Sequence, residues 1–279
     1  PEVYNLIDAA LSEDQAFNDP TTQALVPQGV RAVGMIRAKG QGMLAGIEVS
    51  RAVFQRVDST LDTRVLLPDG SPLSPGSDLA RIEGEAGSIL RAERVALNFL
   101  QRMSGIASET NRYVQAVQGS RSRIVDTRKT APGMRFLDKY AVRMGGGYNH
   151  RLNLADGILI KDNHIQANRF REMGLKDVIQ LALASASHTI KVEVEVETME
   201  QVAEALEAGA HIIMLDNMSA PEMADAMLVI GDQAIVEASG GITYDTVRAV
   251  AETGVDLISI GGLTHSVDAL DISLDLEFD

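Results

Sequence analysis

The feature of this sequence that most constrains its fold is a strand followed by a helix, repeated about every 20–25 residues after residue 120. Short β-branched runs alternate there with helix-length segments that end at glycine. The runs are 124–125, 158–160, 192–196, 212–215, 235–236 and 257–260, and the clearest helices are 199–208, 221–230 and 244–253. This alternation predicts a parallel sheet or an α/β barrel.

The chain before residue 85 follows another pattern. A helical pattern from Tyr4 to Leu11 precedes short apolar runs at 33–36, 43–47 and 65–67, which Pro and Gly separate. This predicts a small mixed sheet with helices. A long helical pattern then runs from Ser88, which we expect to cap it, to about Val117.

The last ten residues alternate strictly between apolar and polar side chains from Leu270 to Phe278. A period of two is typical of a half-buried strand, which fits the mixed sheet better than a parallel strand buried on both faces. We therefore expect two domains. Residues 1–114 form an N-terminal α/β sandwich joined by the tail 268–279, and residues 115–267 form the barrel domain.

Charge is distributed unevenly along the chain. The net charge is −14, yet residues 121–161 hold nine Lys and Arg against three Asp. From residue 191 onward there are 19 acidic residues and two cations. An acidic surface disfavours nucleic acid, and the basic block predicts an anion site instead. The sequence has no cysteine, which excludes disulfides and thiolate chemistry, and no apolar stretch reaches the ~20 residues of a membrane span. We expect a cytoplasmic protein.

Polar residues follow five of the predicted strands. They lie at 126–130, 161–164, 216–217, 237–241 and 261–265. Each could be an ordinary loop or helix cap, but reactive groups of parallel α/β folds gather at this rim. Glycine pairs in the last two segments, at 240–241 and 261–262, precede helical patterns at Tyr244 and Ser266 and predict a phosphate site.

Glu193, Glu195 and Glu197 share one face of a predicted strand. Buried carboxylates need a cation, a metal or water, and Lys161 is the expected partner. A solvated edge strand is the alternative. Arg94 and Arg102 lie on one side of the long helix, which indicates a solvated face or, less commonly, a shared ligand surface.

Several long motifs resemble quinolinate phosphoribosyltransferase, also called nicotinate-nucleotide pyrophosphorylase (carboxylating). The motifs are 96–107 (ALNFLQRMSGIA), 126–133 (DTRKTAPG), 139–152 (KYAVRMGGGYNHRL), 160–165 (IKDNHI), 192–196 (VEVEV), 214–218 (MLDNM) and 259–265 (SIGGLTH). The resemblance implies an open-faced α/β sandwich with an α/β barrel of fewer than eight strands, acting as a dimer or an assembly of dimers. The implied reaction joins quinolinate to 5-phosphoribosyl 1-pyrophosphate and releases pyrophosphate and CO2, which leaves nicotinate mononucleotide for NAD synthesis.

The resemblance also implies roles for particular residues. The residues implied to bind the dicarboxylate are Arg128, Lys129, His150, Arg151 and Lys161. Arg102 resembles an arginine that reaches the neighbouring subunit's site. Glu195 and Asp216 resemble carboxylates that hold the ribose and Mg2+, and Ser239, Gly240 and Gly261 match positions that receive the 5-phosphate. We expect Lys129, Lys161, Glu195 and Asp216 to be the catalytic residues.

One segment departs from the family pattern. Residues 13–22 (EDQAFNDPTT) replace the usual acidic-Leu-Gly and Gly-Asp-Ile/Leu-Thr-Thr pattern.

Three alternative functions remain open. The first is a Schiff-base aldolase or phosphosugar isomerase on the same barrel, which would use Lys161 as nucleophile. The second is a phosphoribosyltransferase for another pyridine carboxylate, and the third is a non-catalytic binder of pyridine carboxylates.

Overall fold

The computed structural model describes residues 2–278, which form two compact units. Unit 1 contains the chain up to Asn111, Thr130–Gly146 and the chain from Gly262 onward. Unit 2 contains Arg112–Lys129 and Gly147–Gly261. The segments 130–146 and 262–267, which the sequence assigned to the barrel domain, therefore group with unit 1. Within residues 2–278 no helix has both the length and the apolar character needed to cross a bilayer.

Unit 1 is built on a four-stranded antiparallel sheet in the order β12-β1-β5-β3. Its strands are β1 (Arg31–Ala38), β3 (Asp62–Val65), β5 (Asp78–Glu85) and β12 (Ile272–Phe278), and β2 (Gly42–Met43) pairs with β4 (Pro72–Leu73). Its helices are α1 (Glu2–Glu13), η1 (Ala16–Asn18), α2 (Pro20–Leu25), α3 (Ile47–Val57), most of α4 (Ala86–Ala116), α5 (Arg135–Met144) and α11 (Gly262–His265). The open-faced α/β sandwich is confirmed.

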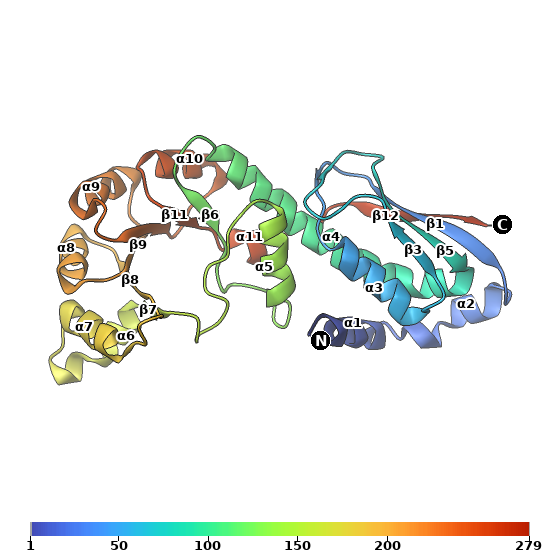
Figure 1. The fold of residues 1–279 in the computed structure, drawn as a ribbon, viewed down its shortest axis with the longest axis horizontal. Helices are drawn as coiled ribbons and strands as arrows, with labels where there is room; N and C mark the ends of the chain where they lie inside the picture. Colours follow the sequence, from blue (N-terminus) through green and yellow to red (C-terminus); the bar gives the residue numbers. More distant parts are fainter. Residues whose placement is uncertain (1, 279) are drawn as a thin grey trace. The chain divides into compact units, whose positions relative to one another are not determined.

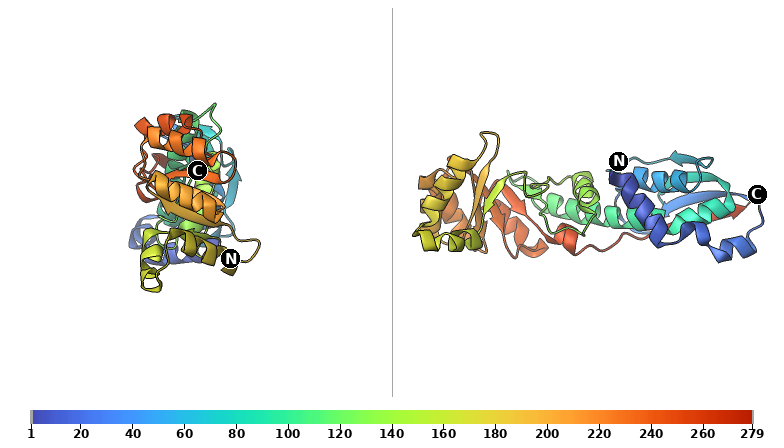
Figure 2. Two further views of the ribbon diagram at one scale, coloured as in Figure 1. Left: turned by 90° about the vertical axis from the view of Figure 1, so that its left-hand side faces the viewer. Right: turned by 90° about the horizontal axis from the view of Figure 1, so that it is seen from below.

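The tail strand β12 completes this sheet, as its alternating pattern predicts. It pairs antiparallel with β1, and the red tail lies beside the blue strand in Figures 1 and 2. Alternate residues of β1 are buried, and Gly34 stands where an added Cβ would lie 2.9 Å from Leu274 and 3.6 Å from Ile89 of α4. The absence of a side chain at Gly34 leaves room for the side chain of Leu274 from the neighbouring strand β12.

Three local predictions for this unit are wrong. Of the run 43–47, only Met43 lies in a strand, because Gly46 at φ 95° precedes α3, which begins at Ile47. Helix α4 begins at Ala86, and the Ser88 N–H donates to the Glu85 carboxylate at 2.5 Å, so Glu85 does the capping expected of Ser88. No helix begins at Ser266, since α11 ends one residue earlier.

Unit 2 contains a six-stranded parallel sheet in the order β6-β11-β10-β9-β8-β7. The strands are β6 (Arg123–Val125), β7 (Ile158–Ile160), β8 (Val192–Val196), β9 (Ile212–Asp216), β10 (Ile235–Ser239) and β11 (Leu257–Ser259). The helices are α6 (Asp162–Ala167), η2 (Arg169–Arg171), α7 (Leu175–Ser185), α8 (Met199–Ala208), α9 (Ala220–Ile230) and α10 (Tyr244–Glu252). Figure 1 shows the sheet curved like an open barrel, with helices along its outer side.

The three helices of unit 2 that the sequence defines, α8, α9 and α10, lie within one residue of their predicted bounds. In α9 Ser219 and Glu222 form a capping box, with Pro221 in the first turn and Gly231 at the end. Thr198 caps α8, and Gly209 ends it in the left-handed conformation at φ 83°. Because the strands joined by these helices are parallel, the carboxyl ends of all six lie at the same rim of the sheet.

Candidate active site

The predicted site residues of unit 2 meet at the carboxyl ends of its strands. Lys161 follows β7 directly, and its Nζ forms an ion pair with Glu195 of β8. The lysine is therefore the partner of one of the alternating glutamates, as predicted. Glu197 lies beyond the end of β8 and is exposed. The face of β8 that points into the barrel thus carries two carboxylates, those of Glu193 and Glu195.

Asp216 and Ser239 lie side by side at the same rim, since they are the last residues of β9 and β10 and are register partners. The side-chain amide of Asn217 donates to the Asp216 carboxylate at 2.9 Å, and the backbone N–H of Asn217 donates to the Ser239 carbonyl at 3.0 Å. Gly240 follows at φ 86°, and a Cβ there would lie 2.3 Å from Asn217 Oδ1. Only glycine fits this turn, which leaves backbone open at the rim. Gly261 lies two residues after the end of β11.

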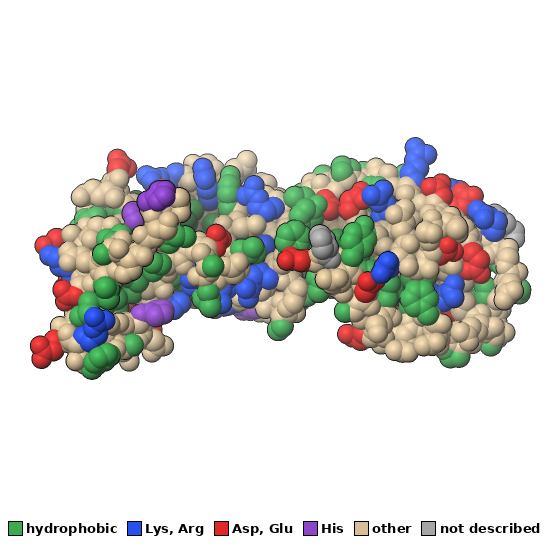
Figure 3. All heavy atoms as spheres, turned by 60° about the horizontal axis from the view of Figure 1, so that its bottom comes forward, with side chains coloured by type: hydrophobic (Ala, Val, Ile, Leu, Met, Phe, Trp, Pro, Cys, Tyr) green, Lys and Arg blue, Asp and Glu red, His purple; other side chains and the backbone are tan. Residues whose placement is uncertain are grey.

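The basic loop after β6 supplies further cations. Arg128 and Arg151 lie close enough for the charge of Arg128 to add to burial in lowering the pKa of Arg151, while the carboxylates of Glu193 and Glu195 act in the opposite direction. The Arg128 Nε is buried and has no hydrogen-bond partner among the described residues. Two neighbouring guanidinium groups, one with an unused buried donor, are suited to a dianion. Figure 3 shows basic side chains gathered on the middle-left part of one face. Lys129 lies in the same loop.

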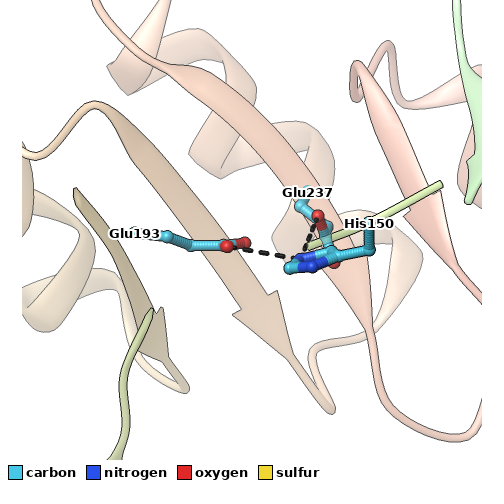
Figure 4. A group of neighbouring side chains, drawn as sticks. All are labelled: His150, Glu193 and Glu237. Carbon is cyan, nitrogen blue, oxygen red and sulfur yellow. Dashed lines mark ion pairs between the residues drawn. The ribbon is translucent and has the colours of Figure 1, made fainter. Parts of the chain in front are cut away.

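His150 lies deeper, beneath this rim. Its Nε2 faces Glu193 Oε2 at 3.3 Å and Glu237 Oε2 at 3.4 Å (Figure 4). Its Nδ1 accepts a hydrogen bond from the backbone N–H of Arg151 at 2.8 Å. The backbone N–H of His150 donates to the buried Asp126 at 2.9 Å. The segment that carries His150 and Arg151 is therefore fixed at several atoms.

The buried His150 cluster, formed by His150, Glu193 and Glu237, has strongly perturbed protonation. Burial lowers the pKa of His150, but hydrogen bonds to both glutamates raise it more, to about 10. Burial also raises the pKa of Glu193. The bond from the Arg151 N–H opposes this rise in pKa, because Nδ1 cannot accept an N–H while it carries a proton. We therefore place the ring proton on Nε2 and a second proton of the cluster on the Glu193 carboxyl, whose pKa burial raises.

Arg102 belongs to unit 1 and is paired there. Its guanidinium donates to the carboxylate of Asp138 at 2.9 and 3.1 Å and to the carbonyl of Thr264 at 3.3 Å. A cavity of about 200 Å3 beside it is lined by residues that include Asn98 and Met134. The side of α4 that carries Asn98 and Arg102 is therefore a concave surface of unit 1.

Comparison with known proteins decides the family. The model for the "quinolinate phosphoribosyl transferase, N-terminal domain" matches residues 19–104, and that for the C-terminal domain matches residues 106–275. The chain belongs to the quinolinate phosphoribosyltransferase family. Both domains of the family are present, in the family's order.

Individual relatives of this family agree over nearly the whole chain. A probable nicotinate-nucleotide pyrophosphorylase [carboxylating] of Bacillus subtilis is 40% identical, with 99% of this chain and 93% of the relative covered. A probable enzyme of the same name from Methanocaldococcus jannaschii is 40% identical over 97% and 96% of the two chains. The crystal structure of NadC from Streptococcus pyogenes superposes with a TM-score of 0.94 at 41% identity, covering 99% and 97%.

Two side chains of the site were not predicted to belong to it. Glu193 was recognised as a carboxylate in need of a partner, but its partner is His150. Glu237 was noted only as one of the polar residues after a strand, although its side chain is 1% exposed and faces the same histidine. A glutamate inside a β-branched parallel strand is the signal that identifies both.

Proposed function

We propose that this protein transfers the phosphoribosyl group of 5-phosphoribosyl 1-pyrophosphate to quinolinate and releases pyrophosphate and CO2. The product is nicotinate mononucleotide, so the reaction is a step of de novo NAD biosynthesis. The observation that carries the proposal is the rim of unit 2, where guanidinium groups and carboxylates stand within electrostatic range of one another. Relatives named for this activity, similar along the full chain, support it.

The cations of the rim are suited to bind quinolinate. Arg128 and Arg151 can pair with its two carboxylates in bidentate fashion, which would hold the ring nitrogen toward the anomeric carbon of the donor. We assign Lys129 and Lys161 to the same pocket. His150 has both ring nitrogens engaged by protein groups, so we assign it to the support of this pocket and not to direct contact with the substrate. Decarboxylation follows transfer: the C–CO2 bond breaks, the quaternised nitrogen stabilises the electron pair left on the adjacent ring carbon, and this carbon then takes up a proton from water. The amine of Lys161 is engaged by Glu195 in an ion pair, as expected of a binding cation.

The carboxylates of the rim are suited to the phosphoribosyl donor. Departure of pyrophosphate leaves a ribose with oxocarbenium character, which Glu195 and Asp216 would stabilise electrostatically. Ser239, Gly240 and Gly261 would receive the 5-phosphate through backbone N–H groups. The two carboxylates also fit Mg2+, which prefers oxygen ligands and phosphate-bound positions. When bound, Mg2+ would neutralise charge on the pyrophosphate leaving group.

We also propose that the enzyme is a dimer or an assembly of dimers in which Arg102 serves the neighbouring site. Its position beside a cavity of unit 1 supports this role. Light scattering and complementation between R102A and K161A chains would test it, since a mixed dimer regains one intact site. The proposed cytoplasmic location stays a prediction.

One assay tests the reaction. The protein is incubated with quinolinate, 5-phosphoribosyl 1-pyrophosphate and Mg2+, and nicotinate mononucleotide, pyrophosphate and CO2 are measured together. We expect all three in equal amounts, and none without quinolinate. Product from nicotinate in place of quinolinate would indicate a different pyridine specificity. Binding without pyrophosphate release would support a non-catalytic binder, and borohydride trapping of a carbonyl substrate on Lys161 would support the aldolase.

A further inference from the structure

The His150 cluster lies one layer below the rim that carries the proposed substrate ligands. Glu193 precedes Glu195 by two residues along β8, and Glu237 precedes Ser239 by two along β10. With a rise of about 3.3 Å per residue, each glutamate lies roughly 6–7 Å below its partner at the rim. A cavity of about 270 Å3 beside the cluster is lined by the strand beginnings, including Ile158 and Leu257, and also by Arg151, whose guanidinium reaches back to the carbonyl just before β7. The two glutamates therefore face the floor of the barrel.

Burial of the Glu193 and Glu237 carboxylates lowers the stability of the folded protein. The side chains of Glu193 and Glu237 are 6% and 1% exposed. Among the described residues, Oε1 of Glu193 and both carboxylate oxygens of Glu237 make no hydrogen bond; the Oε2 atoms of the two glutamates lie 3.3 and 3.4 Å from His150 Nε2 as ion-pair contacts. A buried carboxylate costs several kcal/mol unless it is paired, and an apolar residue is the usual occupant of such a strand. A role beyond packing is therefore needed to account for both.

The histidine links the glutamates to the chain that carries Arg151. Its Nε2 is held between the two carboxylates, while its Nδ1 accepts the backbone N–H of Arg151. Beyond that bond, the Arg151 guanidinium donates to the carbonyl of Gly157 at 3.2 Å. Contacts at both nitrogens therefore fix the orientation of the His150 ring. The contact at Nδ1 in turn holds the backbone of Arg151 in place.

The same bonds disfavour a metal ion, although the ligand atoms of the three residues lie within 4.8 Å of one another. A metal would need the lone pair of Nε2, because the lone pair of Nδ1 already accepts an N–H. The ring would then have no proton left. An imidazole with its proton on Nε2, donated toward two carboxylates, satisfies both contacts.

We propose that Glu193 and Glu237 are positioning residues for the dicarboxylate pocket, which act through His150 to hold Arg151 in place. This inference rests on the proposed binding of quinolinate by Arg151. The glutamates do not touch the substrate, so their effect is confined to how well the arginine is aimed. Misplacement of a binding group by about 1 Å can cost on the order of a hundredfold.

Substitution of Glu237 by glutamine tests the proposal, because it keeps the shape and removes the charge. We expect E237Q to raise the KM for quinolinate roughly tenfold or more, with kcat and the KM for the phosphoribosyl donor nearly unchanged. E204Q, an exposed glutamate on α8 of the same unit, is the matched control and should leave all three constants unchanged. An unchanged KM for quinolinate in E237Q, or an equal rise for both substrates, would overturn the proposal.

A double-mutant cycle shows whether Glu237 acts through Arg151. If it does, E237Q should add little to the effect of R151K, because the group that it positions has already been altered. Fully additive effects would refute the route through the arginine. An inactive wild-type protein would refute the proposed function instead, and the cycle would then be read from quinolinate binding by calorimetry.

Two measurements on the wild-type protein cover the case in which the variants do not fold. Nitrogen-15 NMR of labelled histidines should show one ring with an unprotonated Nδ1 and a protonated Nε2. A proton on Nδ1 of His150 would overturn the proposal. Elemental analysis after dialysis should find no stoichiometric metal, whereas a retained divalent ion that E237Q loses would show that the cluster is a metal site.

Discussion

Substitution of Gly240 by alanine tests the close approach on which the proposed phosphate loop depends. Gly240 has φ 86°, and a Cβ there would lie 2.3 Å from Asn217 Oδ1 and 2.7 Å from the backbone nitrogen of Asn217. The side chain could rotate away, but the nitrogen is held by its bond to the Ser239 carbonyl. Gly241 has a similar φ of 62° and nothing within 4 Å of an added Cβ. G241A is therefore a matched control.

Both variants place an alanine at a positive φ, but only G240A also brings a Cβ into close contact with Asn217. An L-residue in the left-handed region costs about 1–2 kcal/mol, part of which is offset because alanine restricts the unfolded chain by about 0.4–1 kcal/mol. We therefore expect the free energy of unfolding of G241A to be about 1 kcal/mol lower than that of the wild-type protein. G240A bears the same strain and must also displace Asn217, which adds about 1–3 kcal/mol of overpacking. Its total loss is then about 2–4 kcal/mol.

Urea unfolding followed by circular dichroism measures the difference. G240A should unfold at a clearly lower urea concentration than G241A, at equal steepness of the transition. It should also raise the KM for 5-phosphoribosyl 1-pyrophosphate more than the KM for quinolinate, because the displaced turn belongs to the proposed phosphate site. Equal stability of the two variants would show that the approach of Gly240 to Asn217 is not the constraint, and the reasoning would fail.

Three further predictions concern other residues. R128A should weaken quinolinate binding by about 2–5 kcal/mol, measured as a rise in KM, since its buried Nε is available to a carboxylate. D138A should destabilise unit 1 by about 3–5 kcal/mol in urea, because the buried carboxylate accepts from Arg102 and from the Ala131 N–H, whereas exposed E48A should not. Hydrogen bonds from Thr60, first its hydroxyl and then its backbone N–H, lower the pKa of Asp58, so its contribution to stability is present above pH ~4 and is lost as pH falls below the ordinary aspartate range. D58N should therefore be destabilising at pH 7 and nearly neutral near pH 3 by thermal denaturation.

Much of unit 2 could be predicted because local signals and the tertiary fold agree there. The predicted helix 199–208 coincides with α8, since Thr198 and Gly209 are strong boundary residues. Residues 192–196 coincide with β8 because β-branched residues alternate there without glycine or proline. The common rim followed from parallel topology, which places every carboxyl end on one side.

Other features depended on contacts that periodicity does not encode. The sequence indicates that Gly46 is a loop glycine, but it is the residue immediately before α3. It packs closely against Met103 of α4, a contact that the sequence pattern does not show. Helix α5 lies inside the basic block, where charges at 135, 139 and 143 obscured its apolar face. The pairing of Glu193 with His150 joins a strand to a distant loop, so the sequence could show that a partner was required but not which one.

The antiparallel pairing of β12 with β1 has a consequence for synthesis of the protein. A ribosome makes residues 31–38 early and residues 272–278 only after every segment of unit 2 has been synthesised. Until then β1 has β5 on one side and an open edge on the other, where unpaired N–H and C=O groups invite association with other nascent chains. Unit 2, whose segments lie between these two strands in the sequence, can become compact first. The domain that begins the chain is thus the last to be completed, and its edge strand is the point at which translation and chaperones have most influence on yield.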